Sequence, residues 1–219
     1  ELKYSAEHIC DMCWVDMGCG AGNFLAATEA LGVRQCAGFD ADAQLVEAGQ
    51  EYLHTAVLDH FTGSMTDAVH QYRANIYTAF FVMEHVENSR EVYEAMQSWP
   101  SGTVFAFSVP VYGFAALLEN IFSDNYARNL DCVVHTQMYT EESIAYALNM
   151  AGFDIVCRRL LDKNAEDVRR VMLSNLVGKL QGAMFEEAQL RLSELLDPLQ
   201  QCFDKLHLAD QRHILAVRR

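Results

Sequence analysis

The feature that most constrains this chain is a glycine-rich run, VDMGCGAGN, which extends from Val15 to Asn23. It joins a short apolar segment, typical of a buried strand, to a segment with apolar residues at helical spacing. Gly18, Gly20 and Gly22 let the backbone turn sharply and approach a ligand closely, because no Cβ stands in the way. Ligands of open α/β sheets bind at such strand-to-helix turns, where the helix offers unpaired N–H groups. The run therefore predicts a ligand site on an α/β sheet.

Short apolar runs alternate with longer amphipathic ones through the first three quarters of the chain, which indicates repeated βα units. The segments expected to form strands are Trp14 to Met17, Gln35 to Phe39, Asp59 to Thr62, Ile76 to Val82, Thr103 to Val109, Phe153 to Leu160 and His213 to Val217. The segments expected to form helices are 21–32, 43–57, 89–99 and 140–152, the last with a capping pattern at Thr140. This order predicts a Rossmann-like α/β fold with a seven-stranded, mostly parallel sheet and helices on both faces.

Two segments depart from the alternation. Residues 112–135 are rich in aromatic side chains and Asn, and residues 163–208 form a long helical stretch with a break near Asp197-Pro198. The last strand follows the helical stretch, which is therefore an insertion between two strands. We expect a single domain over 1–219, with a core at 10–162 and 209–219, a lid-like insertion at 112–135 and a helical insertion at 163–208. The helical insertion would add core area or form a homodimer surface.

The charge of the chain excludes several kinds of partner. Its formal net charge is −14, so the phosphates of nucleic acids and an anionic membrane surface would be repelled. No window approaches the roughly 18 consecutive apolar residues of a membrane span, and the first residues lack a signal-peptide pattern. We expect a cytoplasmic protein that acts on a small molecule, without nucleic acid or membrane as a partner.

The seven cysteines are odd in number and scattered, so reduced thiols are expected. His8, Cys10 and Cys13 form an H-x-C-x-x-C cluster that could supply three zinc ligands. No second Cys/His pair lies at the spacing that a structural zinc finger needs. We therefore expect no metal site, and an N-terminal segment that leads into the first strand.

Two acidic residues define the kind of ligand. Asp16, two positions before Gly18, suits a ligand with an ammonium group, since a pyrophosphate would be repelled by the carboxylate. The dinucleotide fingerprint would also require Gly or Ala where this chain has Asn23. Asp40 lies at the end of the next predicted strand, about twenty residues on, where a carboxylate can accept both hydroxyls of a ribose. The acids and glycines together indicate a nucleoside-containing cofactor.

With these residues in place, the chain resembles the class I S-adenosylmethionine-dependent methyltransferases, in particular a small-molecule branch with an E-H-V stretch. The resemblance runs through VDMGCGAG, GFDAD, FFVMEHVENSREVYEAM, SWPSGTVFAFSVP and HTQMYTEESIAYALNMAGFDIV. It implies that S-adenosylmethionine is the cofactor. It also implies that Asp16 helps to hold the methionine amino group, that Gly18, Gly20 and Gly22 lie against the cofactor, and that Asp40 binds the ribose.

The remaining expected cofactor contacts are Cys19, Ala41, Ser64, Met65 and Phe81. Ser64 occupies the place where the family commonly has an acid that bonds the adenine amino group. Its hydroxyl could substitute for that acid, and Met65 could pack on the adenine ring. Phe81 belongs to the end of the fourth predicted strand, Phe80-Phe81-Val82, which usually faces both cofactor and acceptor in such folds, so the backbone there and the Phe81 side chain are expected at the pocket.

Methyl transfer is an in-line displacement, so a general base is needed only where the acceptor must lose a proton. His85 and His135 are the candidate bases, because the unperturbed pKa of histidine lies near neutral pH. The alternative for His85 is a structural hydrogen bond with Glu84. The side chains expected to line the acceptor site are Tyr112, Tyr126 and Tyr139.

The sequence thus predicts methyl transfer to oxygen, nitrogen or carbon of a small polar metabolite. The S-V-P and H-x-x-x-Y-T blocks resemble methyltransferases of polysaccharide and secondary metabolism and favour a sugar or nucleotide-sugar acceptor. Two alternatives stay open. One is a nicotinamide-dependent oxidoreductase, whose hydride-transfer residues are not evident in the sequence. The other is a catalytically silent methyltransferase-like binding protein, with the acidic surface and the helical insertion as its interaction face.

Overall fold

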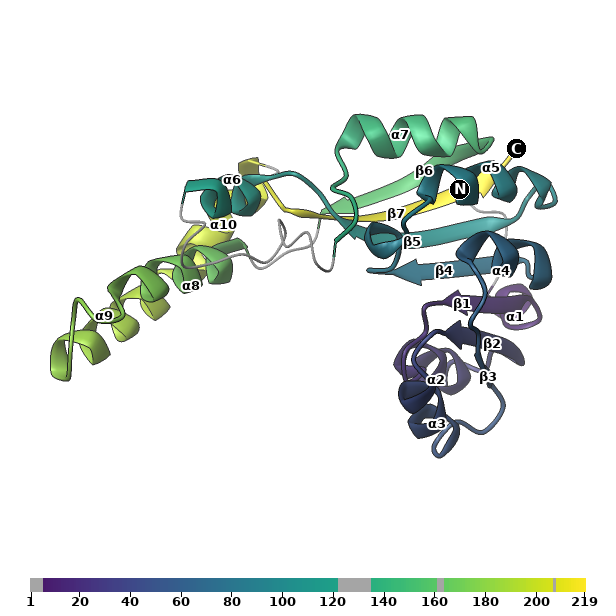
Figure 1. Cartoon of the computed structure of the whole chain (residues 1–219), viewed down its shortest axis with the longest axis horizontal. Helices are drawn as coiled ribbons and strands as arrows, with labels where there is room; N and C mark the ends of the chain where they lie inside the picture. Colours follow the sequence, from purple (N-terminus) through teal and green to yellow (C-terminus); the bar gives the residue numbers. More distant parts are fainter. Residues whose placement is uncertain (1–5, 122–134, 161–163, 207) are drawn as a thin grey trace.

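The computed structural model describes residues 6–121, 135–160, 164–206 and 208–219, and its centre is a seven-stranded sheet (Figure 1). The strands are β1 (Cys13–Met17), β2 (Gln35–Asp40), β3 (Val57–His60), β4 (Ile76–Phe80), β5 (Val104–Pro110), β6 (Phe153–Leu160) and β7 (Gln211–Arg218). Their order across the sheet is β3-β2-β1-β4-β5-β7-β6. β1 to β5 run parallel, and β7 is antiparallel to both of its neighbours. The predicted mostly parallel sheet is confirmed.

The burial of the strands follows their place in the sheet. β4 and β5 lie at the centre, and nearly all of their residues are buried, as expected for parallel strands covered on both sides. β7 alternates buried and half-buried residues, which is the pattern of an antiparallel strand with one covered face. β6 is mostly exposed, and its charged Arg158 and Arg159 suit a strand at the edge of a sheet.

The α-helices are α1 (Ala6–Cys10), α2 (Asn23–Ala30), α3 (Ala43–Gln50), α4 (Met65–Gln71), α5 (Ser89–Ala95), α6 (Phe114–Ile121), α7 (Glu141–Met150), α8 (Asn164–Leu176), α9 (Ala183–Glu194) and α10 (Leu196–Leu206). Two 3₁₀ turns, η1 (Met83–His85) and η2 (Met96–Ser98), follow β4 and α5. The four helices that the sequence predicts are present as α2, α3, α5 and α7, each shorter than expected. Helices α1, α4 and α6 were not predicted; α1 lies in the N-terminal segment that was expected only to lead into the first strand.

Helices pack on both faces of the sheet, as expected. Strand β2 shows this, because successive side chains of a strand point to opposite faces, and Cys36 and Phe39, three positions apart, therefore lie on different faces. Cys36 belongs to a small core cluster with Leu25 of α2 and Val46 of α3. Phe39 belongs to the main core cluster, to which α4, α5 and α7 also contribute. In Figure 1, α7 lies along β6 and β7, whereas α2 and α3 lie at the opposite end of the sheet, beside β2 and β3.

The insertion before the last strand forms three helices, α8, α9 and α10, that extend away from the sheet (Figure 1). Its base is tied to the core by the buried Asn164, whose side-chain amide donates a hydrogen bond to Asp210 beside β7. The rings of Phe114 in α6 and Phe203 in α10 pack with centroids 5.2 Å apart. The break expected near Asp197-Pro198 falls at Leu195, because Pro198 fits the first turn of α10, where its missing N–H leaves no hydrogen bond unmade.

Within the part of the chain that the structure describes, no helix has the length and apolar character needed to cross a membrane. The division into a core and two insertions stays a prediction.

Helix α7 offers a test of the local sequence reasoning. The Thr140 hydroxyl accepts a hydrogen bond from Ser143 N at 3.1 Å, and the Ser143 hydroxyl accepts one from Thr140 N at 2.8 Å, which confirms the predicted cap. We expect Thr140→Ala to lower the free energy of unfolding by about 1 kcal/mol, because a backbone donor loses its partner. Thr140→Ser keeps the acceptor and should lose much less. Urea unfolding checks this, and equal losses in the two variants would contradict the role of the cap.

Candidate functional site

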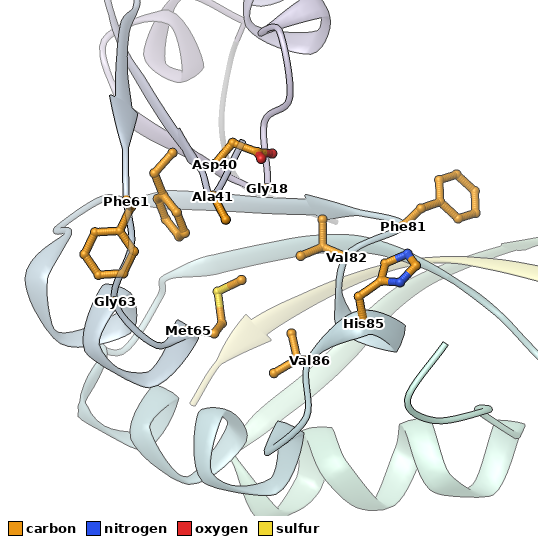
Figure 2. Close-up of a pocket in the computed structure, with 11 residues that line it drawn as sticks. Gly18, Asp40, Ala41, Phe61, Gly63, Met65, Phe81, Val82, His85 and Val86 are labelled. Atoms are coloured by element: carbon orange, nitrogen blue, oxygen red, sulfur yellow. The ribbon is translucent and has the colours of Figure 1, made fainter. Parts of the chain in front are cut away.

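A cavity of about 350 Å³ opens at the carboxyl ends of the parallel strands, where β1 lies between β2 and β4 (Figure 2). The strand order reverses direction at this point, which is where open α/β sheets bind their ligands. The volume lies within the range of small-molecule sites. The residues that line it are Gly18, Phe39, Asp40, Ala41, Phe61, Gly63, Met65, Phe81, Val82, His85 and Val86.

The glycine loop folds back onto the end of β2. The N–H groups of Gly18 and Cys19 donate to the carbonyl of Phe39 at 2.8 and 3.0 Å. Gly18 has a φ of +66°, and a Cβ built on it would lie 2.5 Å from Cγ2 of Val82, in the turn after β4. Both conformation and space therefore require glycine at this position, and its backbone forms part of the cavity wall.

Asp40 is held by two backbone donors. Its Oδ2 accepts from Gly20 N at 2.8 Å, and its Oδ1 accepts from Asp42 N at 2.9 Å. Asp40 lines the cavity, and each carboxylate oxygen keeps a further lone pair. This geometry suits the predicted acceptance of two ligand hydroxyls. Ala41 lines the cavity beside it.

Asp16 is almost fully buried and is not one of the lining residues. The Thr78 hydroxyl of β4 donates a hydrogen bond to its Oδ1. Burial raises the pKa of Asp16 to about 6, the hydrogen bond from Thr78 lowers it, and the charge of Asp40 raises it. Asp16 and Asp40 thus interact electrostatically, but only Asp40 faces the cavity.

Three further predicted residues of the loop lie outside the lining of the cavity. Cys19 turns into the small core cluster, where burial, followed by the charges of Asp16 and Asp40, raises the pKa of its thiol to about 12. Gly20 contributes its N–H to Asp40, as described above. A Cβ on Gly22 would lie 2.7 Å from Cδ1 of Leu53, so its space is also taken by packing.

The loop after β3 supplies an aromatic wall. Phe61 lines the cavity together with Phe39, and the two rings pack with centroids 5.5 Å apart. Met65 lines the cavity as predicted, but Ser64 does not. The Ser64 hydroxyl instead caps α4, accepting from Asp67 N at 3.1 Å and donating to the Asp67 carboxylate at 2.6 Å.

The turn after β4 has an unusual backbone. Phe81 has a φ of 58°, which is rare for a bulky residue, and its side chain is 41% exposed. Its N–H donates to Ser108 of β5 at 2.9 Å. The turn brings Phe81, Val82, His85 and Val86 to the cavity, and Phe81 is therefore where the sequence placed it.

His85 and His135, fifty positions apart in the chain, lie together, with ring centroids 5.0 Å apart. His85 lines the cavity, whereas His135 is not one of the lining residues. The Nε2 of His85 lies 3.9 Å from Oε1 of Glu84, which is beyond the distance of a hydrogen bond. Burial raises the pKa of the Glu84 carboxyl, and the backbone of Glu84 and the two histidines lower it.

Two of the three predicted acceptor-site tyrosines lie outside the lining of the cavity. Tyr112 is exposed, and its hydroxyl accepts a hydrogen bond from Asn120. Tyr139 is buried, and its hydroxyl donates to the carbonyl of Met83 at 3.3 Å. Neither lines the cavity, and Tyr126 falls outside the described residues. Tyr139 therefore supports the turn that carries His85.

Sequence reasoning missed four lining residues, Phe39, Phe61, Gly63 and Val86, and it expected Val82 at the pocket only through the backbone of its strand end. Each lies at or just after the end of a predicted strand, and that position was the available signal.

Comparison with known proteins gives a family match over most of the chain and a similar fold over nearly all of it. The sequence model of a family described as a methyltransferase domain matches residues 2–158. No curated protein sequence matches the chain significantly. Three similar solved structures are a putative sarcosine dimethylglycine methyltransferase from Galdieria sulphuraria (11% identity, TM-score 0.61, covering 96% of this chain and 80% of that one), magnesium protoporphyrin IX methyltransferase from Synechocystis with bound SAH (14%, 0.57, 95% and 74%), and an S-adenosylmethionine dependent methyltransferase from Mesorhizobium loti (14%, 0.58, 100% and 100%).

The crowding at Gly18 can be separated from its backbone strain. Gly102 also has a positive φ, but nothing lies within 4 Å of a Cβ built there. We expect Gly102→Ala to lower the free energy of unfolding by about 1 kcal/mol, which is the cost of the backbone strain alone. Gly18→Ala should lose about 2 kcal/mol more, because the methyl group meets Val82. Urea unfolding of both variants checks this, and similar losses would show that Val82 gives way.

Asp16 predicts a pH dependence. Its pKa is raised in the folded chain, so folding favours the protonated acid, and its contribution to stability falls as the pH rises from about 4 to about 6. Asp16→Asn removes this loss. At about 1.4 kcal/mol for each pKa unit, the variant should gain up to about 3 kcal/mol relative to the native chain between pH 4 and pH 7. Urea unfolding across this range measures the gain, and a pH-independent difference would refute it.

Proposed function

The chain belongs to the methyltransferase domain family, with S-adenosylmethionine as its methyl donor, and we propose that it methylates a small polar metabolite in the cavity beside β1, β2 and β4. The observation that carries this proposal is the position of Asp40 and Gly18 on one side of the cavity and of His85 on another (Figure 2). A cofactor end and an acceptor end can therefore share one space.

The cofactor end is formed by Asp40 and the aromatic wall. The Asp40 carboxylate, already oriented by two backbone N–H groups, accepts the ribose hydroxyls. Phe61 and Met65 supply apolar surface for the adenine ring in place of the hydrogen bond expected from Ser64. Asp16 acts from beneath the loop through its charge, because it does not reach the cavity.

The acceptor end is formed by the turn after β4. Figure 2 shows Phe61 and His85 on opposite sides of the pocket, with Met65 between them. When bound, the cofactor supplies a methyl group from a positively charged sulfur, and the rest of the cofactor is left as a neutral thioether. Val82 and Val86 exclude water from this step, and His85 accepts the proton that the acceptor loses.

The acceptor class follows from the polarity of this end. An imidazole beside valine side chains offers a hydrogen-bond partner to a hydroxyl group in an otherwise apolar wall. A sugar or nucleotide-sugar presents several such hydroxyls, which supports the acceptor that the sequence favoured. Incubation of the chain with labelled cofactor and fractionated metabolite extracts tests the acceptor.

A second candidate, a role as a binding protein, is favoured by the helical insertion. Helix α9 has no buried residue, and large apolar side chains of the insertion are exposed. The most exposed are Val177, Met184, Leu195 and Leu206. A surface of this kind suits contact with a partner or with a second copy of the chain.

Calorimetric titration with S-adenosylhomocysteine tests the cofactor site. We expect the native chain to bind, and Asp40→Asn to lose on the order of tenfold or more in affinity, because the neutral amide keeps the size but binds hydroxyls more weakly. Asp11→Asn is the matched control, since Asp11 makes a surface ion pair with Arg34.

Two results would contradict the proposal. Equal affinity in Asp40→Asn and the native chain would show that the cofactor does not bind in this cavity. Absence of binding, with a fluorescence change on adding NADH, would favour the oxidoreductase, and absence of both would favour the binding protein.

A further inference from the structure

Three side chains with metal-ligating atoms meet beside the cavity. Glu84 and His85 belong to η1, in the turn after β4, and His135 lies ahead of α7. One ligand atom from each lies within 4.8 Å of the other two. Of the described residues, only these three form such a group, and the His8, Cys10 and Cys13 cluster that the sequence suggested does not.

The arrangement is held by the backbone. Thr136 donates to the carbonyl of Glu84 from its N–H at 2.9 Å and from its hydroxyl at 3.0 Å. The side chains of Gln137 and Tyr139 donate to the carbonyl of Met83 at 2.6 and 3.3 Å. These bonds fasten the segment 135–139 to the turn and set the two imidazoles close together. The group is therefore organised before any ligand binds.

The environment of Glu84 is the observation that indicates a bound ligand. Its side chain is 1% exposed, and its Oε2 has no hydrogen-bond partner within the described parts of the chain. A buried carboxylate oxygen without a partner is strongly unfavourable, and a bound cation would satisfy it. A carboxylate that served only to fix the turn would be expected to use both oxygens.

The donor set defines the kind of cation. Imidazole nitrogens favour zinc, iron, copper and nickel over magnesium and calcium, which prefer oxygen ligands. Two histidines and one carboxylate bind catalytic zinc or iron in other proteins and leave coordination positions open. We propose that Glu84, His85 and His135 bind one divalent transition-metal ion at the acceptor end of the cavity.

The ion would change the task of His85. A hydroxyl group coordinated to a divalent cation loses its proton more easily, so the acceptor could be activated by the ion itself. His85 would then hold the ion instead of accepting the proton. This role in the reaction rests on the proposed methyl transfer, whereas the binding of the metal does not.

The test measures metal binding to the full chain without cofactor. The protein is treated with a chelator, dialysed, and titrated with zinc by calorimetry and with cobalt by visible absorption. We expect one ion to bind, with no thiolate charge-transfer band, because no cysteine belongs to the group. His85→Ala and His135→Ala should each weaken binding by on the order of tenfold or more. His60→Ala and Cys13→Ser are the matched controls and should bind as the native chain does.

The variants keep the test independent of folding. His85 is partly exposed, so His85→Ala should fold, which circular dichroism checks. Glu84→Gln is a further variant, and it counts only if it folds. Absence of binding, or binding that survives both histidine variants and disappears in Cys13→Ser, would overturn the proposal.

The same preparations are titrated with S-adenosylhomocysteine, which separates this inference from the proposed function. Metal binding without cofactor binding would support the metal site and refute the methyl transfer. Cofactor binding without metal binding would refute the metal site alone.

Discussion

The hydrogen bonds between the glycine loop and the end of β2 are the interactions on which the site depends. Phe39 accepts from two N–H groups of the loop, and Asp40 accepts from a third, at Gly20. These bonds fold the loop over the sheet at the point where the strand order reverses, so Gly18 meets Val82 while Asp16 is enclosed below. The position of the cavity, the orientation of its carboxylate and the burial of a second acid all follow from one local contact between consecutive parallel strands.

The other side of the cavity depends on contacts between distant parts of the chain. The turn after β4 departs from the sheet through the strained backbone of Phe81, and the segment before α7 attaches to it through Thr136, Gln137 and Tyr139. Backbone strain of this kind persists only where the surroundings hold it, and it often marks functional turns. Here it places the histidine of the turn at the cavity and leaves a neighbouring carboxylate buried.

The fold could be predicted from the sequence to a large extent, because apolar runs, glycines and caps act locally. All seven strands and the cap at Thr140 were recognised in this way. Within the site, Asp40 was recognised because its strand end is a fixed place in such sheets. Ser64 was assigned to the ligand although it caps α4, since a hydroxyl can bond either partner and the sequence does not say which lies closer. The approach of His135 to His85 depends on a tertiary contact, and no local pattern reports it.

The insertion of helices α8 to α10 has a consequence for how such a chain can vary. Leu160, at the end of β6, lies opposite Arg212 in β7, so the chain leaves the sheet and returns to it at neighbouring positions. A tight hairpin could span that gap, and lengthening a connection whose ends already meet adds only a small closure entropy. The helices can therefore be exchanged, shortened or replaced as a unit, while the strand pairing that supports the cavity stays intact.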